Sequence, residues 1–134
     1  MSGKFTLNTD GGARGNPGPA AIGVTLQSEN GESIFEHKEK IGITTNNVAE
    51  YRALIKGLEL ALQNGVQDIE CILDSELVVK QVNGLYRVKE GNLKILHGEV
   101  KNLLAKFNSH QVKHVRRKDN SRADKLVNQA LDNK

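Results

Sequence analysis

Four acidic residues occupy places in the sequence where a charged side chain is unexpected. Asp10 and Asp74 each end a predicted strand, in FTLNTD and IECILD. Glu50 and Asp124 each share a helical stripe with apolar residues, so their carboxylates project from the faces that should be buried. Because clustered buried carboxylates repel one another, cations must lie among them. Oxygen ligands of this kind suit Mg²⁺ or Mn²⁺, and paired ions can promote phosphodiester hydrolysis.

Each acid taken alone also has an explanation from local structure. Glu50 fits position N3 of a capping box whose N-cap is Asn47. Asp74 fits the N-cap of the helix that follows it. Asp124 would be unremarkable on a solvated helix face, although Val127 on the same stripe argues against that. The metal site is therefore favoured only by the four acids together.

The segment TDGGARGNPGPA, which contains Asp10, places four glycines and two prolines directly after the acid. It lacks the GxxxxGK[ST] and GxGxxG spacings, so a nucleotide-binding loop is not indicated. Glycines allow a main chain to approach a ligand closely. We therefore expect Asp10 to hold a cation and the glycine-rich turn to contact the ligand.

The elements that must position these residues follow from hydrophobic periodicity. Strands are expected at residues 4–10, 20–27 and 33–42, with a hairpin turn at Asn30-Gly31. The later elements are a helix through Leu54 and Leu62, a strand at 69–74, helices at 75–84 and 92–107, a strand at 111–115 and a helix at 120–131.

This order of elements predicts an α/β fold in a single domain over residues 1–134. Its mixed five-stranded sheet has an antiparallel meander of three strands and two parallel strands, with helices on both faces. Asp10 and Asp74 would then meet beyond the carboxyl ends of adjacent parallel strands.

Composition narrows the class of protein and its partners. No segment approaches the roughly 18 apolar residues of a membrane span, and the start of the chain lacks the apolar stretch of a secretory signal. We therefore expect a cytoplasmic protein with no membrane partner, and we interpret the single Cys71 as a core residue. A net charge of +3 favours a polyanion partner, and basic residues concentrate at 113–125, although a solvated surface explains that run equally well.

Four ordered blocks of the sequence resemble the type 1 ribonuclease H family, whose members cut the RNA strand of RNA/DNA hybrids. The blocks are TDGGARGNPGPAAIG, TTNNVAEYRALIKGL, LDSELVVKQVNGLY and HVRRKDNSRADKLVN, and they cover nearly the whole chain. The resemblance implies the ribonuclease H-like fold and an endonuclease that leaves 5′-phosphate and 3′-hydroxyl ends by a two-metal-ion mechanism. It also implies that Asp10, Glu50, Asp74 and Asp124 bind two Mg²⁺ ions, with Mn²⁺ as an alternative.

The resemblance implies a substrate surface as well. Asn16, Asn46 and Asn47 match family positions that contact nucleic acid, and Gly11 and Gly12 begin the turn that would approach the RNA. The 2′-hydroxyls of a hybrid line a wide, shallow minor groove that backbone and amide groups can read.

Family members often carry a histidine in the loop before the last acid, and compact members can use an arginine there. His114 and Arg117 both fit the spacing from Asp124. We favour Arg117 as the assisting catalytic residue, because His114 falls within a predicted strand.

The sequence departs from the larger bacterial members, which carry a basic, tryptophan-containing handle before the last strand. This chain has no tryptophan, so we expect a compact form whose hybrid binding is weaker or less selective. Residues 113–125 would then supply much of the phosphate attraction, with a strong dependence on salt. The expected partner is an RNA/DNA hybrid, with double-stranded RNA left open and no obligatory protein partner.

Two other functions are compatible with parts of this sequence. A binding module of the same fold would hold the nucleic acid without cutting it, but the four intact acids favour an enzyme. A transposase or integrase core shares the fold, but usually needs further DNA-binding domains that 134 residues do not accommodate.

Overall fold

In the computed structural model, which describes residues 3–133, a meander of strands is followed by alternating helices and strands. The elements in chain order are β1 (Lys4–Ala13), β2 (Gly18–Gln27), β3 (Ser33–Thr44), α1 (Asn46–Gln63), β4 (Asp68–Leu73), α2 (Glu76–Val82), α3 (Gly91–Leu104), β5 (Ser109–His114), the 3₁₀ turn η1 (Arg117–Asn120) and α4 (Ser121–Asp132). The predicted order of elements is confirmed.

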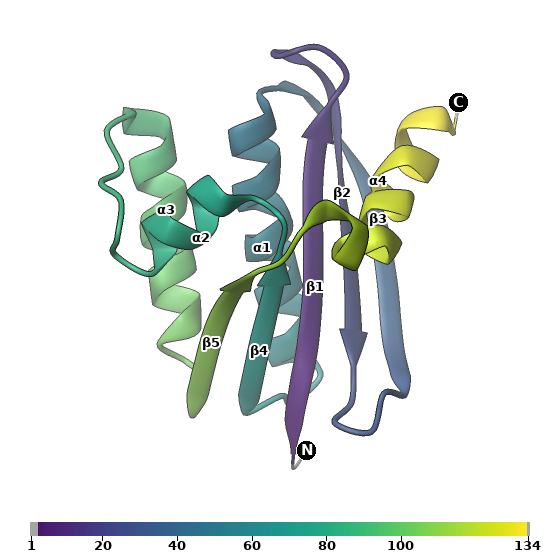
Figure 1. Cartoon of the computed structure of the whole chain (residues 1–134), viewed down its shortest axis with the longest axis vertical. Coiled ribbons are helices and arrows are strands. Elements are labelled where there is room, and N and C mark those ends of the chain that lie inside the picture. The colour runs from purple at the N-terminus through teal and green to yellow at the C-terminus, as the bar shows by residue number, and fades with distance from the viewer. Residues whose placement is uncertain (1–2, 134) are drawn as a thin grey trace.

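The strands form one five-stranded sheet in the order β3-β2-β1-β4-β5 (Figure 1). The pairs β1–β2 and β2–β3 are antiparallel, whereas β1–β4 and β4–β5 are parallel, as predicted. In the parallel pair β1–β4 the register ends with Thr9 opposite Leu73. Asp10 and Asp74 therefore follow at adjacent positions on the same edge of the sheet.

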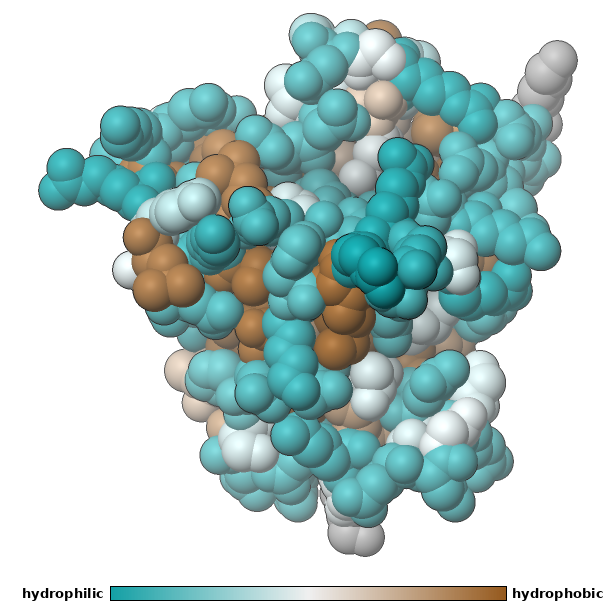
Figure 2. Space-filling model, in the orientation of Figure 1, coloured by the Kyte–Doolittle hydropathy of each residue, from teal (hydrophilic) through white to brown (hydrophobic). Residues whose placement is uncertain are grey.

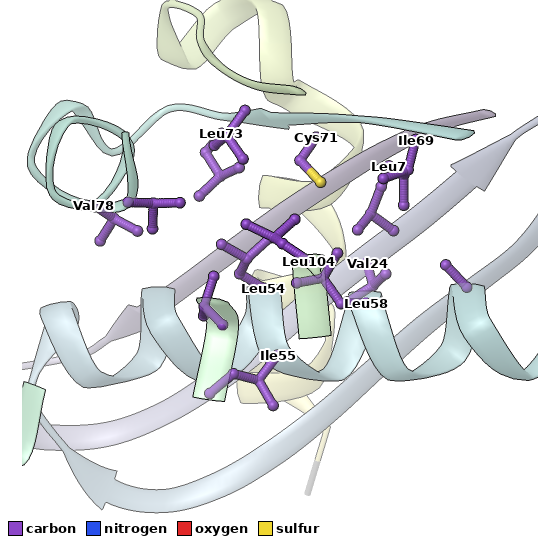
Figure 3. Packing of buried hydrophobic residues seen from close by; sticks show 14 of the residues in the cluster. Leu7, Val24, Leu54, Ile55, Leu58, Ile69, Cys71, Leu73, Val78 and Leu104 are labelled. Atoms are coloured by element: carbon purple, nitrogen blue, oxygen red, sulfur yellow. The ribbon is translucent and has the colours of Figure 1, made fainter. Parts of the chain in front are cut away.

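Helices cover both faces of the sheet, with α4 on one side and α1 on the other (Figure 1). The main core lies on the α1 side, where Leu54 and Leu58 point toward strand residues such as Leu7 (Figure 3). Cys71 is fully buried in this core, which confirms its interpretation. A smaller cluster of Ala21, Val127, Ala130 and Leu131 packs α4 against the other face.

Several predicted ends of elements were wrong, because tertiary pairing extends or shortens them. β1 continues past Asp10 to Ala13, since its pairing with β2 runs on until Ala13 lies opposite Ala20. α3 ends at Leu104, although helical spacing predicted a helix to Phe107. Phe107 is still buried in the core, but from the turn that follows the helix. Among residues 3–133, no helix is both long enough and apolar enough to cross a bilayer.

Candidate metal centre and nucleic-acid surface

Three of the four predicted acids converge where β1, α1 and β4 meet. One carboxylate oxygen from each of Asp10, Glu50 and Asp74 lies within 4.8 Å of the others. Asp10 and Glu50 are only 7% and 8% exposed. All three line a cleft of about 490 Å³. β1, the end of β4 and the α1 stripe thus bring together side chains that are up to 64 positions apart in sequence, the difference between residues 74 and 10.

Glu50 does not serve as part of a helix cap. The N-cap of α1 is Thr45, whose Oγ1 accepts a hydrogen bond of 3.2 Å from the Val48 N–H, so the expectation of Asn47 as N-cap was wrong. Glu50 lies one turn further in, and its Oε1 accepts a hydrogen bond from the Gly11 N–H instead. The carboxylate is therefore tied to the main chain of β1.

Gly11 permits this arrangement because it has no side chain. A Cβ added at Gly11 would lie 2.1 Å from the Ala49 carbonyl oxygen, far inside any van der Waals contact. A Cβ at Gly12 would meet only Val127, at an ordinary 3.7 Å. The close approach that Gly11 allows is thus made by α1, which brings Glu50 to the site.

Asp74 is likewise not the cap of the helix that follows. Ser75 takes that role, because its Oγ accepts a hydrogen bond of 3.3 Å from the Val78 N–H. Asp74 is held instead by Asn120, whose Nδ2 donates to Asp74 Oδ2 at 3.1 Å. Sequence reasoning missed Asn120, which stands at the start of the last helix and looks there like an ordinary helix cap.

Asp124 lies on the wall of the cleft rather than in the cluster of three acids. Its Oδ1 accepts a hydrogen bond of 3.0 Å from Arg117 Nη2, and its side chain is 26% exposed. Arg117 also lines the cleft, whereas His114 is an exposed residue at the end of β5 and does not line it. This geometry favours Arg117 over His114 as a group that acts at the site.

Burial and mutual repulsion disfavour the charged forms of the clustered acids. Burial raises the pKa of Asp10, and the negative charges of Glu50 and Asp74 raise it further. Burial also raises the pKa values of Glu50 and Asp74, while hydrogen bonds from Gly11 and Asn120 oppose that effect. A divalent cation would supply the missing positive charge, and a set of carboxylate oxygens suits a hard ion. The residues present therefore fit a divalent metal.

Two of the predicted nucleic-acid contacts are joined by hydrogen bonds inside the protein. The Asn16 Oδ1 accepts a bond of 3.0 Å from the Asn46 main-chain N–H, and the Asn46 Oδ1 accepts one of 2.8 Å from the Ala13 N–H. These bonds fasten the turn after β1 to the start of α1. Within residues 3–133 the amide N–H₂ groups of these two side chains donate no hydrogen bond, so they remain available to a ligand. Asn46 and Asn47 line the cleft, whereas Asn16 does not.

The basic run at 113–125 is largely engaged with acidic partners. Its four ion pairs are Lys113–Glu70, Arg116–Asp119, Arg117–Asp124 and Arg122–Glu36. The surface that Figure 2 shows is mostly hydrophilic, with smaller hydrophobic areas among the polar groups. Part of the positive charge counted from sequence is thus balanced locally.

The sequence is similar to those of known ribonuclease H proteins. The sequence matches the family described as reverse transcriptase-like over residues 8–130. It is 46% identical over 123 residues to ribonuclease HI of Halobacterium salinarum and 40% identical over 130 residues to bifunctional protein Rv2228c of Mycobacterium tuberculosis. These alignments cover 92% and 96% of this chain, but only 62% and 36% of the relatives. The chain thus spans less than two thirds of each of them.

Solved structures resemble the fold closely. The crystal structure of RNase H1 from Halobacterium salinarum has a TM-score of 0.96 and 43% identity, and the match covers 98% of this chain and 100% of that one. The structure of LC11-RNase H1 in complex with an RNA/DNA hybrid has a TM-score of 0.91 and 44% identity, and the match covers 96% of each chain.

Proposed function

The chain belongs to the ribonuclease H family, and from this premise we propose that it is an endoribonuclease that hydrolyses the RNA strand of RNA/DNA hybrids. The observation that carries the proposal is the convergence of Asp10, Glu50 and Asp74 within 4.8 Å on one cleft. The hybrid bound to LC11-RNase H1 supports the choice of substrate. The proposal also comprises a single domain over residues 1–134 that acts in the cytoplasm without an obligatory protein partner.

In this proposal Asp10, Glu50, Asp74 and Asp124 hold two Mg²⁺ ions, with Mn²⁺ as an alternative. When bound, such ions activate a water and stabilise the attacking and leaving oxygens of an in-line displacement that gives 5′-phosphate and 3′-hydroxyl ends. The support from the chain lies in its donor set, which consists of carboxylates raised in pKa by burial and by one another. Such groups gain most from a nearby cation.

Arg117 and the glycine-rich turn complete the proposed site. Arg117 orients Asp124 through their 3.0 Å hydrogen bond, and its side chain, which is 77% exposed, presents positive charge to a phosphate at the cleft. Asn16, Asn46 and Asn47 offer amide donors to the 2′-hydroxyls of the RNA strand. Gly11 and Gly12, which line the cleft beside them, place the main chain against the minor groove.

The proposal is tested with one labelled RNA strand, annealed in turn to complementary DNA and to complementary RNA, and with a labelled DNA duplex. Each substrate is incubated with the protein in Mg²⁺, in Mn²⁺ and in EDTA, and the products are separated on a denaturing gel. We expect metal-dependent cleavage of the RNA in the hybrid and an intact DNA duplex. If RNA in the hybrid stays intact in both metals while the protein still binds it, the chain is a binding module instead.

A further inference from the structure

We propose that Asn120 is a positioning residue for the metal centre, which fixes Asp74 against β1 beside Asp10 and sets the place of α4 next to them. The inference rests on the proposed function as a metal-dependent nuclease. Asn120 is 2% exposed, and its side-chain amide makes three hydrogen bonds to other elements. These bonds link β1, at the residues just before Asp10, to Asp74 at the end of β4.

The amide replaces a sheet contact that is missing at this point. The ladder between β1 and β4 ends with Thr9 opposite Leu73, so its pairing does not extend to Asp74. Asn120 Nδ2 donates to the Thr9 carbonyl oxygen at 2.9 Å and to Asp74 Oδ2 at 3.1 Å. The two hydrogens of one amide nitrogen thus hold the carboxylate in a fixed relation to the β1 main chain, one residue before Asp10.

The oxygen of the same amide is anchored as well. Asn120 Oδ1 accepts a hydrogen bond of 2.9 Å from the Nδ2 of Asn8, a residue of β1 like Thr9. A side chain with its donors and its acceptor all engaged cannot rotate without breaking several bonds. Asp74 is therefore held by a group that is itself fixed.

A purely local role does not account for this use of the amide. Asn120 is the N-cap of α4, and asparagine is among the best residues for accepting a cap hydrogen bond there, yet it makes none. Thr45 and Ser75, at the corresponding positions of α1 and α2, both accept one. The Asn120 side chain joins β1 to Asp74 instead of capping its own helix.

The position of Asn120 also couples the two walls of the cleft. It ends the η1 turn that begins with Arg117, and it lies four residues before Asp124 on α4. Through the bonds to Thr9 and Asp74, it sets the separation between Asp124 and the cluster of three acids. Loss of the amide would therefore loosen the metal centre while leaving the asparagines at the start of α1 in place.

The test compares Asn120→Ala with the control variant Asn83→Ala. Asn83 also bridges two elements, because its Nδ2 donates a hydrogen bond of 3.0 Å to the Val112 carbonyl oxygen, but it does not line the cleft. The first readout is binding of Mn²⁺ alone by isothermal titration. We expect the dissociation constant of Asn120→Ala to rise by about tenfold to a hundredfold, as is typical when a residue that orients a metal ligand is lost. Asn83→Ala should bind Mn²⁺ as the unmodified protein does.

The second readout is the kinetics of hybrid cleavage. We expect kcat of Asn120→Ala to fall by about tenfold to a hundredfold while KM for the hybrid stays within about twofold. If Asn120→Ala does not fold by circular dichroism, Asn120→Ser replaces it, since the hydroxyl is smaller and provides one donor in place of two. Its Mn²⁺ affinity should still fall measurably below that of Asn83→Ala.

Unchanged Mn²⁺ affinity and kcat in the folded Asn120 variant, with only a lower Tm, would overturn this inference and assign Asn120 a structural role. That outcome is distinct from failure of the proposed function, in which the unmodified protein itself would not cleave the hybrid in metal.

Discussion

Replacing Asp10 by asparagine should stabilise the metal-free protein, although it removes a residue of the proposed active centre. Two unit charges 4.8 Å apart, the upper limit of separation in the cluster, repel by about 3.5 kcal/mol at an effective dielectric constant of 20. At pH 7 the destabilisation by the charged Asp10 cannot exceed the free energy of protonating this carboxylate. Once the repulsion costs more than that, Asp10 binds a proton and loses its charge. With an ordinary aspartate pKa of 3.8, protonation at pH 7 costs about 4 kcal/mol, which is the limit of the destabilisation. We therefore expect the free energy of unfolding to increase by about 2 to 4 kcal/mol.

The pH dependence of this effect has a definite sign. The pKa of Asp10 is higher in the folded protein than in the unfolded chain, because of burial and the charges of Glu50 and Asp74. Between these two pKa values the folded state binds more protons, so the stability of the unmodified protein falls as the pH rises above about 4. Asp10→Asn removes this contribution. Its advantage should thus vanish as the pH approaches 4 and should grow as the pH rises through neutrality.

The assay is urea unfolding in EDTA, followed by circular dichroism at several pH values. Asp132→Asn is the matched control, since Asp132 is an exposed acid that pairs with Arg14 and has a lowered pKa. Only Asp10→Asn should raise the midpoint, and added Mg²⁺ should stabilise the unmodified protein more than this variant. Equal or lower stability of Asp10→Asn at pH 7 in EDTA would refute the reasoning that the three carboxylates repel one another.

Two further substitutions test how the site is built. Gly11→Ala should lower the free energy of unfolding by more than about 3 kcal/mol in urea denaturation, because its Cβ would lie 2.1 Å from the Ala49 carbonyl oxygen. A change of less than about 1 kcal/mol would contradict the packing argument. Arg117→Ala should change stability by less than about 1 kcal/mol, since exposed ion pairs contribute little, but should lower kcat for hybrid cleavage at least tenfold. An unchanged kcat would exclude Arg117 from the reaction.

The sequence predicted the sheet and three of the four acids well, because these depend on short-range patterns. Alternating residues identify β1, and a parallel neighbour places Asp10 and Asp74 at one edge. Glu50 was placed on the buried face of α1 by its spacing from Leu54 and Leu58. Each of these inferences uses the spacing of a few neighbouring residues and the geometry of one helix or of one parallel pair of strands.

The helix caps and the hydrogen bonds of the site were not predictable in the same way. In TTNN every residue is a good N-cap. Asn46, the residue after the cap, is held by hydrogen bonds with Ala13 and Asn16, which lie 33 and 30 positions earlier in the chain. Asn120 bonds to partners 112, 111 and 46 positions away, so no local pattern reveals them.

Gly11 was predicted to face a ligand because glycine allows any close approach, and the sequence does not show that α1 is what approaches it.

The most direct measurement of the central claim is cleavage of an end-labelled RNA strand in a DNA hybrid by the unmodified protein and by Asp10→Asn in parallel. Both proteins are assayed in Mg²⁺ and in EDTA, and the ends of the products are identified. We predict that only the unmodified protein in Mg²⁺ cuts the RNA, leaving 5′-phosphate and 3′-hydroxyl ends, while Asp10→Asn still binds the hybrid. Equal cleavage by Asp10→Asn, or cleavage that persists in EDTA, would contradict a reaction that depends on metal held by these carboxylates.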